Sequence, residues 1–171
     1  KAEASLFWLK DLHKAMLTPV VNRAIATEQE DQNIVLMHHL GKYRTVDVPL
    51  STRMAPHPEL IKPILHQWLR DVAGVHDRLG AKARQVYGLT PQEARELSEI
   101  AQMTKMLFSV VQPLSYANNR FGRLLENILR LQWRLPWKDL SKNDYEKFVQ
   151  RLGEFETQNL PQIIQKAQSK S

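Results

Sequence analysis

The sequence predicts an all-α protein with one small β element. Through most of its 171 residues, apolar side chains recur every three or four positions, as they do on the buried face of a helix. One stretch, residues 41–56, loses that period and is richer in β-forming residues. The hydrophobic fraction of 43% and the charged fraction of 25% are ordinary for a globular protein. We therefore expect one domain that spans residues 1–171.

The chain is expected to begin with an amphipathic helix. Its apolar face consists of Leu6, Leu9, Leu12, His13 and Met16. We expect this helix to break near Thr18–Pro19, because a proline inside a helix removes one backbone hydrogen bond and clashes with the preceding turn.

The stretch after the first helix predicts the β element. Residues 43–48 combine β-formers with poor helix formers, and Gly41 and Pro49 bound them. They form either one short strand or a hairpin whose second strand lies around residues 50–54. The sequence leaves both alternatives open.

Helical periodicity resumes after Pro58, in a helix that carries Pro63 in its first turn. A long central helix starts at Thr90, which caps it, and Glu93 three positions later completes a capping box. It ends before Pro113, because the residue ahead of a proline disfavours helical geometry. Its inward face is expected to consist of Ala94, Leu97, Ala101, Thr104, Leu107 or Phe108, and Val111.

Three more helices are expected towards the C-terminus. The first runs from about residue 120 to 135 and stops at Pro136. The second runs from residue 141 and is closed by Gly153, and the last covers residues 160–167. The inward side chains of the first are expected to be Leu124, Leu125, Ile128, Leu131 and Leu135.

Composition excludes several classes of function. The absence of cysteine rules out disulfides, thiolate metal sites and a cysteine nucleophile. The net charge is +6, but the basic residues are dispersed, so we expect no nucleic-acid partner. No apolar run reaches the ~18 residues of a membrane span, and no signal-peptide pattern is visible. We expect a cytoplasmic protein, or an exported effector without a classical signal peptide.

The chemistry is concentrated in the loop between the two longest helices, residues 112–123. A polar loop that leads into a helix N-terminus offers unpaired backbone N–H groups and the positive end of the helix dipole, which together attract anions. Asn118 and Asn119 tolerate the positive φ that a concave cluster of amides needs. Arg120 and Arg123 are three apart, so both can face one phosphate.

The same loop allows a purely structural interpretation. The two asparagines could only cap the following helix. The two arginines could pair with Glu126 or Asp139. From the residues alone, an anion site and this interpretation carry equal weight.

The loop resembles the motif of Fic domains, His-Pro-Phe-x-(Asp/Glu)-Gly-Asn-Gly-Arg-x-x-Arg. Pro113, Asn118, Arg120 and Arg123 match that motif at the right spacing. The stretches 41–44 and 56–58 resemble the region of the Fic flap. The resemblance implies a Fic-like helical bundle with a small β-hairpin flap, which docks a protein segment beside the loop. The flap residues are Tyr43, Arg44, Thr45, Val46, Asp47 and Val48.

The departures from the motif concern the residues that catalyse. Fic enzymes transfer AMP, or another phosphate-containing group, to a target hydroxyl, with the motif histidine as the base. Gln112 stands at that position, and a carboxamide cannot act as a general base. Tyr116 stands where the family's acid holds Mg²⁺, and Leu114 replaces the packing phenylalanine. Ala117 and Asn119 replace glycines and are similar to the related Doc motif.

The resemblance thus implies a degenerate Fic domain of bacterial origin that is inactive for AMP transfer. It leaves ATP or another nucleotide as a candidate ligand, does not require Mg²⁺, and implies a protein partner at the flap. The residues implied to hold phosphate are Ala117, Asn118, Asn119, Arg120 and Arg123. The alternative is a divergent transferase, which would need another base, with Tyr116 or His57 as candidates. A helical module whose loop binds nothing is a third hypothesis.

Overall fold

The computed structural model of the chain describes residues 2–25, 40–50, 53–85, 88–139 and 142–169. Within these ranges, only the backbone is described for residues 2–7, 20–25 and 142–145. The helices are α1 (Ala2–Ile25), the short 3₁₀ helix η1 (Pro58–Leu60), α3 (Ile61–Ala83), α4 (Pro91–Val111), α5 (Asn118–Gln132), α6 (Lys142–Glu154), the π-helical turn η2 (Phe155–Asn159) and α7 (Leu160–Gln168). These ranges contain no strand, so the predicted all-α class is confirmed.

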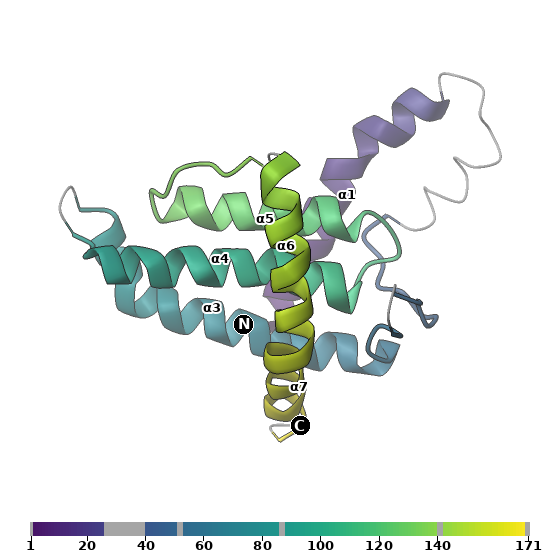
Figure 1. Cartoon of the computed structure of the whole chain (residues 1–171). Coiled ribbons are helices and arrows are strands. Elements are labelled where there is room, and N and C mark those ends of the chain that lie inside the picture. The colour runs from purple at the N-terminus through teal and green to yellow at the C-terminus, as the bar shows by residue number, and fades with distance from the viewer. Residues whose placement is uncertain (1, 26–39, 51–52, 86–87, 140–141, 170–171) are drawn as a thin grey trace.

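Helices α3, α4 and α5 lie side by side (Figure 1). Helix α4 is the middle of the three and packs against both neighbours. The continuous rod formed by α6, η2 and α7 crosses them, and α7 packs against α3. Among the described residues, no helix is both long and apolar enough to pass through a bilayer.

Two clusters of buried side chains form the core. The larger one joins α1, α3, α4, α5 and α7, and it includes Leu9, Leu65, Trp68, Leu107, Phe108, Phe121 and Leu160. The smaller one lies where α3 and α4 meet the end of α5, and it includes Val75, Leu79, Leu97, Ala101 and Trp133. The inward face predicted for α4 is confirmed from Leu97 to Val111, whereas Ala94 in the first turn is only half-buried.

The start of α4 and its contact with α5 are fixed by local chemistry. Thr90 accepts a hydrogen bond from the N–H of Glu93, whose carboxylate accepts the N–H of Thr90, so the predicted capping box is confirmed. In α5, a Cβ added at Gly122 would lie 2.8 Å from the Cβ of Phe108 and 3.2 Å from the carbonyl oxygen of Lys105. Glycine at this position therefore allows α5 to lie close to α4.

The predicted break near Thr18–Pro19 is wrong, because α1 continues through Pro19 to Ile25. The hydroxyl of Thr18 donates to the carbonyl of Lys14 at 2.7 Å. Pro19 is exposed, so water can serve the carbonyl that loses its helical donor.

Two predictions about the C-terminal half are also wrong. Leu131 is not inward but 56% exposed, because the chain after α5 folds back on the other face, where Arg130 donates to the carbonyl of Pro136 at 2.7 Å. Gly153 does not close a helix, because α6 continues through η2 into α7. Phe155 and Leu160, on either side of that junction, are both buried, and their packing keeps the rod continuous.

The predicted β element is only partly formed. Instead of a strand over residues 43–48, the described chain has two isolated antiparallel bridges, Tyr43 with Leu114 and Pro49 with Met54. The first bridge pairs the segment with the loop after α4. Beside the second bridge, the N–H of Ala55 donates to the carbonyl of Val48 at 2.9 Å.

Candidate functional site

The loop between α4 and α5 is shaped by Asn118, which is only 5% exposed. Its Oδ1 accepts the N–H of Leu114 at 2.8 Å, and its Nδ2 donates to the carbonyl of Leu114 at 2.7 Å. The same Nδ2 donates to Oε1 of Gln112 at 3.1 Å. The carboxamide of Asn118 is thus used to hold the loop in shape, and any ligand would meet the backbone around it.

Gln112 ends α4 with φ of 49°, in the left-handed region. Its Nε2 donates to the carbonyl of Ser109 at 2.7 Å, and its Oε1 accepts from Asn118. The side chain at the position of the motif histidine therefore links the last turn of α4 to the first residue of α5. It offers no basic atom for taking a proton.

Arg44 attaches residues 43–48 to the end of α4. The guanidinium is 4% exposed and donates to the carbonyls of Gln112 at 2.8 Å and Val111 at 3.1 Å. It also donates to the carbonyls of Val46 and Pro56. A cation at a helix C-terminus satisfies unpaired carbonyls and complements the dipole. The structure thus gives Arg44, one of the predicted docking residues, an anchoring role.

Backbone hydrogen bonds bring the predicted flap against the predicted loop. The N–H of Arg44 donates to the carbonyl of Pro113, and the N–H of Ser115 donates to the carbonyl of Lys42, both at 3.1 Å. A cavity of about 340 Å³ lies between the two segments. It is lined by Arg44, Thr45, Val46, Val48, Gln112, Leu114, Ser115, Tyr116, Ala117 and Asn118.

Helix α5 begins at this cavity without a side-chain cap. Ala117 is its N-cap residue, and its φ of 56° is left-handed. Asn118 and Asn119 are the first two residues of the helix, so the positive φ expected at the asparagines falls on Ala117 instead. The first turn carries no acidic residue. The amides that open α5 therefore keep their positive potential.

The two arginines of the motif do not line the cavity. Arg120 is exposed on the first turn of α5. One nitrogen of Arg123 lies 3.5 Å from a carboxylate oxygen of Asp139, and the two side chains are 41% and 84% exposed. For Arg123, the pairing with Asp139 that the structural interpretation predicts is therefore present. Asn119 is exposed and is also absent from the lining.

His13 of α1 reaches the loop from far along the chain and is completely buried. Its Nδ1 accepts the N–H of Gly41 at 3.1 Å, so the ring proton lies on Nε2, which is 2.9 Å from the carbonyl oxygen of Tyr116. The ring packs edge-on against Phe121, with centroids 5.3 Å apart. Burial lowers the pKa of His13. With both nitrogens occupied, this imidazole has no lone pair to offer a substrate.

The remaining candidate groups lie apart from one another. Tyr116 is 44% exposed and lines the cavity, whereas His57 is exposed, does not line it, and lies 3.7 Å from a carboxylate oxygen of Glu59. The ring of Tyr43 lies under the ammonium of Lys10 at 4.6 Å, and burial raises the pKa of its hydroxyl to about 12. Of the two proposed substitute bases, only Tyr116 faces the cavity.

From the sequence, His13 is one of six histidines that could supply a displaced base, but a surface or core-edge position is the preferred interpretation for each. One signal was available, because His13 occupies the apolar face of the first helix, four residues after the buried Leu9. A histidine on such a face is buried and needs polar partners. The identity of those partners, Gly41 and Tyr116, depends on contacts across the fold.

In comparisons with known proteins, no family model matches this chain, and no curated protein matches it significantly. The likeness to Fic domains therefore rests on the loop and flap residues quoted above and stays a resemblance.

Proposed function

We propose that this chain is a degenerate Fic-like domain that binds a nucleotide or another phosphorylated ligand in the cavity between residues 44–48 and 112–118. In this proposal it recognises the ligand without transferring AMP. The observation that carries the proposal is the cavity itself. The predicted flap and the predicted anion-binding loop are some 70 residues apart in the chain, and together they line it. Its volume of about 340 Å³ lies within the range of small-molecule sites.

The start of α5 supports phosphate as the bound group. An uncapped helix N-terminus presents several N–H donors and the positive end of the dipole to an anion. Ala117 and Asn118 line the cavity at that point. We propose that the ligand's phosphate lies against these amides, with Asn118 holding them in place.

The arginines join the site once the ligand is present. Arg120 is exposed on the first turn of α5 and can reach towards a bound phosphate. Arg123 would exchange Asp139 for the phosphate, and this exchange costs little because an exposed ion pair is worth only about 0–1 kcal/mol. An arginine and a phosphate form a stronger, bidentate contact.

The lack of a base supports recognition without transfer. Gln112 carries no basic atom, and both nitrogens of His13 are occupied. General-base catalysis contributes about 10²–10⁴-fold to rate. A hydroxyl brought to this cavity would therefore stay protonated.

We further propose that a protein segment docks on the flap beside the ligand. Val46 and Met54 are 65% and 52% exposed, and both belong to the segment that faces the loop and turns back at the Pro49–Met54 bridge. Exposed apolar side chains next to a strand-like backbone suit the addition of an extended peptide.

Calorimetric titration with ATP and ADP, each with and without Mg²⁺, tests the binding. We expect binding that does not require Mg²⁺ and that weakens about tenfold when Arg120 and Arg123 are both replaced by alanine. Arg84→Ala removes an exposed arginine just after α3 and serves as the control. Affinity that is the same in the double variant and the control would remove the arginines from the site.

A transfer assay with labelled nucleotide separates this proposal from a divergent transferase. We expect no label on target proteins from the unaltered chain. Gln112→Ala should be as inactive as the unaltered chain, since glutamine takes no part in proton transfer. Robust labelling that disappears in Tyr116→Phe would instead favour the transferase, with Tyr116 as its base.

A further inference from the structure

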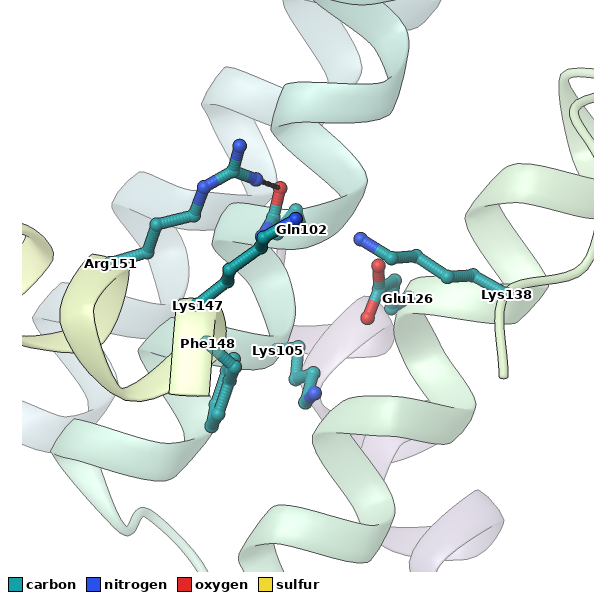
Figure 2. A pocket seen from close by; sticks show the side chains of 7 residues that line it. All are labelled: Gln102, Lys105, Glu126, Lys138, Lys147, Phe148 and Arg151. Carbon is teal, nitrogen blue, oxygen red and sulfur yellow. Dashed lines mark hydrogen bonds between the residues drawn. The ribbon is translucent and has the colours of Figure 1, made fainter. Parts of the chain in front are cut away.

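A second cavity lies on a different part of the surface, between α4, α5 and α6, and Figure 2 shows it from close by. Its volume is about 240 Å³. None of its lining residues belongs to the loop or the flap described above. The lining residues are Gln102, Lys105, Glu126, Lys138, Lys147, Phe148 and Arg151.

Four cations and one carboxylate meet in this cavity. Lys105 comes from α4 and is buried, with its ammonium 3.7 Å from the centre of the Phe148 ring. Arg151 donates to Oε1 of Gln102 at 2.8 Å, which holds the guanidinium at the rim (Figure 2). Lys138 and Lys147 line the cavity from the chain after α5 and from α6. The surplus of positive charge favours an anionic ligand.

Glu126 adds a buried hydrogen-bond acceptor to the basic residues of this cavity. The residue is 3% exposed, and its Oε1 is buried without a hydrogen-bond partner in the described chain. Burial raises the pKa of the carboxyl group, while the charges of Lys138, Lys105, Arg130 and Arg123 act in the opposite direction. A buried acceptor without a donor is costly, so a bound group that donates a hydrogen bond would be stabilised here.

A hydrogen-bond acceptor surrounded by cations favours an anion that also carries a hydrogen-bond donor. Hydrogen phosphate is negative yet still carries a P–OH donor at neutral pH, whereas a phosphomonoester, whose second pKa is about 6, has mostly lost that proton. Sulfate has the same shape but no proton to donate, so it would place a bare oxygen against the carboxylate. With Glu126 ionised, its carboxylate repels sulfate, whereas it accepts a hydrogen bond from hydrogen phosphate.

We propose that the cavity lined by Lys105, Glu126, Lys147 and Arg151 is a phosphate site that prefers protonated phosphate groups to sulfate. The lysines and Arg151 attract the phosphate oxygens, and Oε1 of Glu126 accepts the P–OH proton. The ligand that fits this chemistry is inorganic phosphate in its singly protonated form, HPO₄²⁻, which carries both the negative charge and the proton. This site is separate from the nucleotide cavity of the proposed function and does not depend on it.

An NMR titration with sodium phosphate and sodium sulfate, at equal ionic strength and neutral pH, tests the site. Phosphate should shift the backbone amides of residues 102–105 and 147–151. Sulfate should shift the same amides but bind about 10- to 100-fold more weakly, which is the loss of affinity expected for one charge-assisted hydrogen bond. Equal affinity for the two anions, or phosphate shifts confined to residues 115–120, would overturn the proposal.

Two variants locate the preference in particular residues. Replacing Lys147 and Arg151 together by alanine should weaken phosphate binding about tenfold, and both residues are exposed, so the fold should be retained. Glu126→Gln keeps the shape but removes the carboxylate, so the preference for phosphate over sulfate should fall about tenfold. Arg84→Ala, at an exposed position just after α3, should change neither result. An unchanged preference in Glu126→Gln would refute the role of the carboxylate.

Discussion

The ring Nε2 of His13 lies 2.9 Å from the carbonyl oxygen of Tyr116, and these residues are 103 positions apart in the chain. On its other side the same ring accepts the N–H of Gly41, just ahead of the flap. One neutral imidazole thus ties together the first helix, the flap and the loop. Its arrangement requires that Nδ1 carry no proton, and this requirement makes the site sensitive to pH.

We expect the free energy of unfolding to fall as the pH drops below the ordinary histidine pKa of 6.5. Burial lowers the pKa of His13 in the folded protein, although its hydrogen bond to Tyr116 acts the other way. The unfolded chain therefore binds a proton first, so the stability from neutral His13 is complete above 6.5 and is lost as the pH falls towards the folded pKa. Denaturant titrations between pH 5 and 8 measure this slope.

His13→Gln should flatten that slope and destabilise the protein by about 1–3 kcal/mol, because buried partners lose hydrogen bonds. His57→Gln removes an exposed histidine and should leave both slope and stability unchanged. A slope that persists in His13→Gln would assign the pH dependence to another group.

Replacing Ala117 by glycine should stabilise the protein by about 0.5–1 kcal/mol. Alanine at φ of 56° is strained, whereas glycine adopts this conformation without a steric cost. Ala94→Gly, in the first half of α4, should have the opposite sign, because glycine weakens a helix. Thermal unfolding of the two variants checks both signs, and a loss of stability in Ala117→Gly would show that the positive φ is not strained.

Gly122→Ala should destabilise the protein by about 1–3 kcal/mol, because the new methyl would lie 2.8 Å from the Cβ of Phe108 and force α5 away from α4. Gly74→Ala in α3 is the matched control, since nothing lies within 4 Å of a Cβ there, and it should stabilise by about 0.5–1 kcal/mol. Chemical denaturation measures both. Equal effects at the two positions would refute the close approach of the helices.

Arg44→Lys should destabilise the protein by about 1.5–3 kcal/mol and loosen the flap. An ammonium cannot replace a planar guanidinium that donates to four carbonyls in different directions. Hydrogen exchange should become faster at the N–H groups of Arg44 and Ser115, which pair the flap with the loop. Arg84→Lys, at an exposed position, should change neither property. Unchanged exchange in Arg44→Lys would exclude the anchoring role.

The elements that were predicted correctly are those fixed by local chemistry. Thr90 and Glu93 define the start of α4 by themselves, and Pro113 limits its end. The predictions at Pro19 and Gly153 failed because each rested on one residue: α1 continues through an exposed proline, and packing of Phe155 and Leu160 accompanies the continuous helix after Gly153. Local signals predict helix ends only where tertiary packing does not oppose them.

The candidate site was predicted as two separate segments, and only the fold brings them together. Spacing indicated that Asn118 and Ala117 belong to one loop, but the pairing of Ser115 with Lys42 spans 73 positions. The direction of Arg123 towards Asp139 also depends on how the chain folds back after α5. The basic cavity around Glu126 was missed because its cations are dispersed along the sequence and converge only in three dimensions.

A crystal structure of the protein grown with saturating ATP tests the central claim most directly. We predict that the nucleotide phosphates lie against the amides at the start of α5, in the cavity between Val46 and Ala117, with the triphosphate intact. A cavity that stays empty at saturating ATP, or a nucleotide bound only at another place on the protein, would contradict the account.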